Sequence, residues 1–158
     1  MSEIRYHTNN SIIYSYHEIL EDKINKVCDK IGFNDSDVTW FIFNPNELKC
    51  VDSRIPGQII KYIYRGMDYG FCDLKKKEIW ISTAAIMRDY FQSLPNKMYS
   101  SFGLSRSTEP DFLADVIIDE ITHIQTGCDH GDQSYDMKLR ENAIKYYIPL
   151  IERLWVKR

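Results

Sequence analysis

The chain has 158 residues, of which 44% are hydrophobic and 27% charged, so it can bury the core of one globular domain but is too short for two ordinary ones. The formal net charge is −3 and the basic residues are dispersed, which argues against a nucleic acid as the main ligand. No segment is typical of a signal peptide or a membrane span. We therefore expect a cytoplasmic protein with no membrane partner, whose widely spaced cysteines are reduced thiols.

The first half of the chain predicts one helix followed by strands. Apolar residues recur every three or four positions over Ser15–Ile31, and Gly32 follows, which is typical of an amphipathic helix and its end. The residues before this helix, including His7, are expected to be unstructured. Three short runs rich in β-branched and aromatic residues predict strands, at Val38–Phe43, Gln58–Tyr64 and Glu78–Ser82. We expect Tyr69–Asp73 to pair with the third strand across a lysine-rich turn.

A helix is predicted directly after the third strand. Thr83–Leu94 has helical composition, and Ser82 or Thr83 can cap its first turn. The apolar residues expected to face inward are Ile86, Tyr90, Phe91 and Leu94. The following stretch, Pro95–Thr108, is rich in Ser, Asn and Gly and predicts a long loop.

Two further helices are predicted at the end of the chain. The run Thr108-Glu109-Pro110-Asp111 combines a capping hydroxyl, a proline in the first turn and an acid three residues after the cap. This pattern predicts a helix that is capped by Thr108 and ends at Gly127. Its inward residues are expected to be Leu113, Ile117, Ile121 and Ile124, with Asp115, Asp119, Thr122, His123 and Thr126 on the other side. A last helix, Asp132–Tyr147, is expected to end or kink at Pro149. The predicted fold is α+β, a single domain with a small mixed or antiparallel sheet packed against helices.

The helix that ends at Gly127 carries the candidate chemistry. Asp119 and His123 are four residues apart, so their side chains share one helical face with Cβ atoms about 5–6 Å apart. Glycine permits the chain to reverse, so His130 can return over the same face as a third ligand of one ion. Two ligands from a helix and one from the following turn leave a coordination position open for water, which is typical of a catalytic zinc site.

These residues resemble the motif of the zincin metallopeptidases, in particular the small SprT-like and minimal gluzincin-type domains. In that family H-E-x-x-H is followed closely by a third His in a His-Gly context, and here the sequence reads DEITH with His130-Gly131 after it. The resemblance extends over about residues 38–147, through Tyr69–Cys72, a strand ending in Ser and a helix before the motif.

The resemblance implies a metal-dependent peptidase with a protein or peptide as its substrate. Glu120 corresponds to the general base, His123 and His130 to metal ligands, and the metal is expected to be Zn²⁺. In such a family the strand before the active-site helices is the edge that binds extended substrate, so the candidate substrate strand is Ile79, Trp80, Ile81 and Ser82. Asp129 and Tyr135 flank His130 and are candidates for supporting the ligands or the transition state.

The first ligand position departs from the family motif, because Asp119 stands where the motif has histidine. An aspartate can bind zinc through oxygen, but its carboxylate is shorter than an imidazole and cancels one unit of the ion's charge. We therefore expect slower hydrolysis or none. The oxygen ligand also makes Mn²⁺ or Fe²⁺ a candidate.

Three alternatives remain open. The first is a catalytically inactive zincin-fold module that holds a protein partner, and the second is a protease that acts near DNA, which the acidic charge disfavours. The third is a solvated helix face with no site, on which Asp119 and His123 form an ordinary contact between residues four apart.

Overall fold

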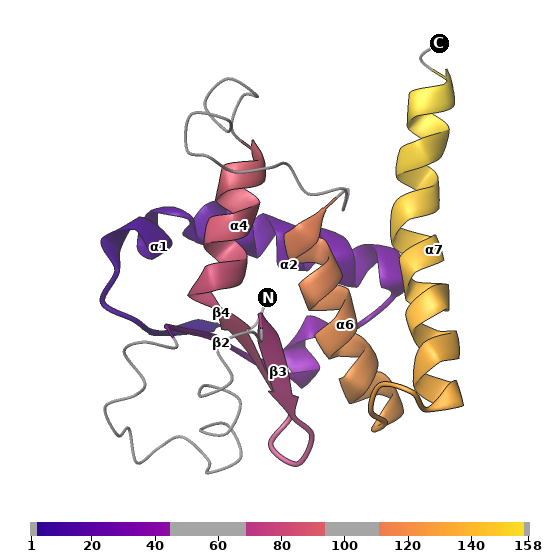
Figure 1. Cartoon of the computed structure of the whole chain (residues 1–158), viewed down its shortest axis with the longest axis horizontal. Coiled ribbons are helices and arrows are strands. Elements are labelled where there is room, and N and C mark those ends of the chain that lie inside the picture. Colours follow the sequence, from indigo (N-terminus) through magenta and orange to yellow (C-terminus); the bar gives the residue numbers. More distant parts are fainter. Residues whose placement is uncertain (1–2, 45–68, 94–110, 157–158) are drawn as a thin grey trace.

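The computed structural model describes residues 3–44, 69–93 and 111–156, and it has the predicted α+β architecture (Figure 1). The strands are β1 (Ile4–His7), β2 (Thr39–Phe43), β3 (Gly70–Asp73) and β4 (Glu78–Ser82). The helices are α1 (Ser11–Ser15), α2 (His17–Ile31), the 3₁₀ turn η1 (Asp35–Asp37), α4 (Thr83–Ser93), α6 (Phe112–Thr126) and α7 (Gln133–Val156).

The four strands form one mixed sheet in the order β1-β2-β4-β3. β1 and β2 are parallel, because α1 and α2 carry the chain back before β2 begins, and β4 is parallel to β2. β3 and β4 form the predicted antiparallel pair across the lysine-rich turn, where the Asp73 carboxylate accepts the N–H groups of Lys75 and Lys76. In this strand order β2 and β4 are the central strands, and β1 and β3 lie at the two edges.

Both faces of the central strands are buried. Trp40 and Ile42 on β2 belong to the main core with α2 and α6. Phe41 and Trp80 face the other way and are partners in the β2–β4 register, with parallel rings whose centroids are 4.2 Å apart. Burial on both faces explains why these strands read as continuous apolar runs and not as alternating ones.

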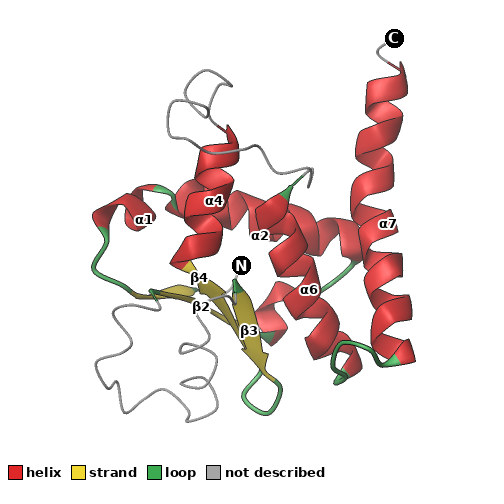
Figure 2. Cartoon of the chain, viewed as in Figure 1, coloured by secondary structure: helices red, strands yellow, loops and turns green. Residues whose placement is uncertain are grey.

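α6 is the central helix of the structure and packs against α2, α4, α7 and β3 (Figure 2). The N-cap of α6 is Asp111, whose carboxylate accepts the N–H of Ala114, so the predicted cap at Thr108 is wrong. The same carboxylate accepts hydrogen bonds from Lys23 on α2 and Tyr146 on α7, at 2.8 and 2.9 Å. The start of α6 is therefore fixed to both neighbouring helices.

The structure corrects the helix predictions in three places. The predicted Ser15–Ile31 helix is divided at Tyr16 into α1 and α2. The segment before it, which contains His7, is predicted to be unstructured but forms strand β1 and pairs with β2. Tyr90 on α4 is 39% exposed and does not face inward, although Ile86 does. α7 continues through Pro149 to Val156, so the helix neither ends nor is interrupted there.

Some predictions fall outside the described residues, namely the strand Gln58–Tyr64 and the loop Pro95–Thr108. Within the described part of the chain, no helix combines the length and the apolar character that a membrane span requires. Cys28, Cys72 and Cys128 are free thiols, and burial raises the pKa of the Cys28 thiol to about 12.

Candidate metal centre

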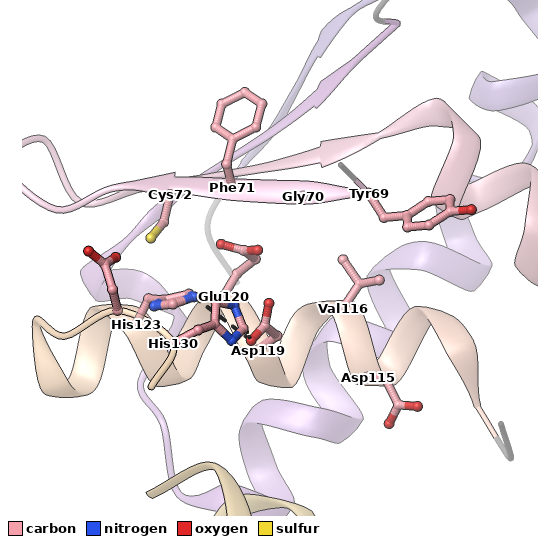
Figure 3. Close-up of a pocket in the computed structure, with 11 residues that line it drawn as sticks. Tyr69, Gly70, Phe71, Cys72, Asp115, Val116, Asp119, Glu120, His123 and His130 are labelled. Atoms are coloured by element: carbon pink, nitrogen blue, oxygen red, sulfur yellow. Dashed lines mark hydrogen bonds and ion pairs between the residues drawn. The ribbon is translucent and has the colours of Figure 1, made fainter. Parts of the chain in front are cut away.

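The centre is built on the last turns of α6 and the turn that follows. Gly127 ends the helix in the left-handed conformation, with φ of 66°, and its N–H donates to the carbonyl oxygen of His123. The chain then reverses, and His130 returns over the helix toward Asp119 and His123 (Figure 3). The predicted role of Gly127 in bringing the third residue back is confirmed.

The three predicted ligands converge in the structure. One ligand atom each of Asp119, His123 and His130 lies within 4.8 Å of the other two. The Nε2 atoms of the two histidines are 3.2 Å apart. Asp119 Oδ1 lies 3.8 Å from His123 Nε2 and 3.5 Å from His130 Nε2. Ligand atoms on a tetrahedral zinc ion with bonds of about 2.0–2.1 Å are separated by about 3.3–3.4 Å, so this donor set fits such an ion after small shifts.

A hydrogen bond to the backbone determines which ring nitrogen of His123 carries the proton and which one can bind a metal. Its Nδ1 lies 2.7 Å from the carbonyl oxygen of Cys128, which can only accept, so Nδ1 carries the proton. In the neutral ring the lone pair is then on Nε2, beside His130 and Asp119. This arrangement, in which the second ring nitrogen donates to a carbonyl, is the usual support of a metal-binding histidine.

Asp119 is held in a partly buried position, with 29% of its side chain exposed. Burial raises the pKa of its carboxyl above the ordinary value, while His130 and His123 act in the opposite direction. Burial alone disfavours the charged carboxylate, whereas a positive charge at the point where these three residues meet would favour it.

Glu120 is 4% exposed and lies on the side of α6 that faces β3. In Figure 3 its carboxylate points from α6 toward Gly70 and Cys72, beside the two histidines. Burial, together with a hydrogen bond to Glu120, raises the pKa of the Cys72 thiol well above its ordinary range. Cys72 is thus a neutral thiol that can donate to Glu120, and not a nucleophilic thiolate.

The convergent residues line one pocket of about 390 Å³ between α6 and β3. Its described lining consists of Tyr69, Gly70, Phe71, Cys72, Asp115, Val116, Asp119, Glu120, His123, Asp129 and His130. The volume lies in the range of small-ligand sites and is sufficient for a few residues of a peptide beside a bound ion.

The two candidate supporting residues differ. Tyr135 is completely buried, donates its hydroxyl to Asp119 and stacks on His123 with ring centroids 4.5 Å apart. Asp129 is exposed at the pocket rim, and its N–H donates to Asp132 Oδ2. Tyr135 is therefore in direct contact with the candidate ligands, whereas Asp129 lines the pocket beside them.

The predicted substrate strand, β4, is not an edge of the sheet, so the expectation of an edge strand at these residues is wrong. β4 lies between β2 and β3 and is paired on both sides, so its backbone has no side available for an extended substrate. Its residues are also buried, namely Ile79 (0% exposed), Trp80 (3%), Ile81 (0%) and Ser82 (0%). Among the described strands β3 is the one that borders the pocket, and it pairs on one side only. Residues 69–72 belong to the resemblance, but the sequence contains no signal that places them at the site.

Gly70 is the point of closest approach between β3 and α6. A methyl group added there would lie 3.0 Å from Val116 Cγ1 and 3.2 Å from the carbonyl oxygen of Trp80. It would also lie 3.3 Å from the Cγ of Glu120. Glycine at this position allows the strand to form one wall of the pocket directly against the helix.

We therefore expect Gly70→Ala to lower the free energy of unfolding by about 1–3 kcal/mol, because the backbone oxygen of Trp80 cannot move as freely as a side chain. Urea denaturation of the wild type and the variant measures the change. Equal midpoints and slopes would show that β3 is not tightly packed on α6.

In comparisons with known proteins, no family model, curated protein or solved structure matches the chain.

Proposed function

We propose that the protein is a metal-dependent hydrolase of zincin type that cleaves peptide bonds. The observation that carries the proposal is the convergence of Asp119, His123 and His130 within 4.8 Å, on the same pocket as Glu120. Asp119, Glu120 and His123 share one helix, as the two ligands and the general base of a zincin do. In addition, β3 pairs with β4, and helices α4 and α6 follow β4. This order of elements agrees with that of the family that the sequence resembles.

A divalent ion held by these three side chains would supply Lewis-acid chemistry, lowering the pKa of a water molecule and polarising a carbonyl. Glu120 would take the proton from the attacking water on its carboxylate and return it to the nitrogen of the leaving amine. Gly70 and the half-buried Cys72 lie over Glu120, which is itself only 4% exposed, so little water surrounds its carboxylate and electrostatic interactions there are strengthened.

Zinc is the metal that we propose, because two imidazole nitrogens and one carboxylate oxygen form one of the common catalytic zinc donor sets. The carboxylate ligand reduces the net charge of the centre and so weakens its Lewis acidity relative to a three-histidine site. Mn²⁺ and Fe²⁺ accept the same donors and are the alternative metals for this centre.

The proposal is tested first by elemental analysis of tag-free protein after reconstitution with Zn²⁺, Mn²⁺ or Fe²⁺. We expect one metal ion per chain in the wild type and at least about a hundredfold weaker binding in His123→Ala, which loses one of three ligands. His17→Ala is the matched control, since His17 lies on α2, is 40% exposed and pairs with Glu21 away from the pocket.

Four results contradict this proposal or narrow it. The absence of metal from the wild type after reconstitution, or retention of metal by His123→Ala, would exclude the centre. Stoichiometric metal without hydrolysis would instead favour the alternative of a zincin-fold module that holds a protein partner. Salt-dependent binding of DNA by the loaded protein would favour the protease that acts near DNA.

A further inference from the structure

We infer that Tyr135 is a positioning residue that holds Asp119 in its ligand conformation and thereby sets the metal affinity of the centre. The inference rests on the proposed metal site and adds a residue outside its ligands and its pocket lining. Tyr135 lies in the first turn of α7, sixteen residues after Asp119 in the chain.

The side chain of Tyr135 is completely buried, so it does not reach a substrate in the pocket. Its hydroxyl donates to Oδ1 of Asp119, the oxygen that also lies nearest to both histidine Nε2 atoms. A carboxylate oxygen has two lone pairs, so the hydroxyl can occupy one and leave the other for an ion. The hydrogen bond also restricts the rotation of the Asp119 carboxylate.

The ring of Tyr135 supports the two other ligands. Its centroid is 4.5 Å from that of His123, at an interplanar angle of 22°, and 4.7 Å from that of His130, at 61°. One buried side chain is therefore in contact with all three ligands. This matters most for His130, which is 68% exposed and lies on a turn, because such a side chain has more rotamer freedom to lose when it binds an ion.

The test is Tyr135→Phe, which keeps the ring and removes only the hydroxyl. Tyr147→Phe is the matched control, because Tyr147 lies on the same helix and donates its hydroxyl to another α6 aspartate, Asp115. Zn²⁺ affinity is measured by competition with a chromophoric chelator, and the visible absorption of the Co²⁺-loaded protein reports the coordination geometry. We expect Tyr135→Phe to bind both ions about 10–100-fold more weakly and to change the Co²⁺ spectrum, with neither change in Tyr147→Phe.

A purely structural role is separated by measuring thermal stability with and without Zn²⁺. A positioning role predicts that Tyr135→Phe reduces the stabilisation by metal, since that stabilisation depends on affinity. Equal affinity and an equal Co²⁺ spectrum in Tyr135→Phe and wild type would overturn the inference while leaving the metal centre intact. Failure of the wild type to bind either ion would overturn the proposed function together with the inference.

Discussion

Replacement of Glu120 by Gln is expected to lower peptide hydrolysis by about 10²–10⁴-fold while the protein retains its metal. The amide has nearly the shape of the carboxylate but cannot take a proton from water, and general base catalysis contributes about that factor. Glu120 is 4% exposed and lines the pocket beside Asp119 and His123 without belonging to the convergent ligand group, so the substitution leaves the three donors in place. The measurement is the initial rate on a mixture of quenched fluorescent peptides, together with the metal content.

Glu21→Gln serves as the control, because Glu21 is an exposed residue of α2 whose partner is His17. It should keep the wild-type rate. A chelator should abolish wild-type activity, and added Zn²⁺ should restore it. Unchanged turnover in Glu120→Gln would rule out Glu120 as the general base, and loss of metal in this variant would show that Glu120 helps to hold the ion.

Ile121→Ala is expected to lower the free energy of unfolding by about 2–5 kcal/mol, the largest change in stability that we predict. Ile121 is completely buried in the main core, between Glu120 and Thr122 on α6. Its truncation removes apolar contacts and leaves a cavity beneath the helix that carries the candidate centre. Urea denaturation with fluorescence detection gives the change in midpoint.

Ile144→Ala is the matched control, since the same atoms are removed from a side chain on α7 that is 53% exposed. A change within about 0.5 kcal/mol is expected there, as for most surface substitutions. Similar losses in the two variants would contradict the packing of α6 as the central helix.

Local sequence patterns predicted the apolar face and the C-terminal end of the motif helix, but not its N-cap, which is Asp111. The apolar spacing placed Leu113, Ile117 and Ile121 inward, and each is completely buried. Gly127 ends the helix as predicted, and the spacing of Asp119 and His123 put their side chains on one face. These features depend on helical periodicity and on one glycine conformation, both of which are local properties of the chain.

The strand order could not be deduced in the same way. β4 was expected at an edge of the sheet, yet it is paired with β2 on one side and β3 on the other. Both central and edge strands can be short and apolar, and only the pairing between distant segments distinguishes them. β1 pairs with residues 36 positions further along the chain, at Ile4 and Trp40, and no local pattern contains that information.

The sequence by itself determined that this protein is an α+β domain and that three ligand-type side chains occupy one helix face and the turn after it. The tertiary structure decided which groups surround them. It set Tyr135 of α7 beneath Asp119 and His123, placed the Cys128 carbonyl against His123 Nδ1, and brought Gly70 of β3 against Glu120. The physical reason is that helix periodicity is fixed by contacts three or four residues apart, whereas the environment of a site depends on the packing of elements that are distant in the chain.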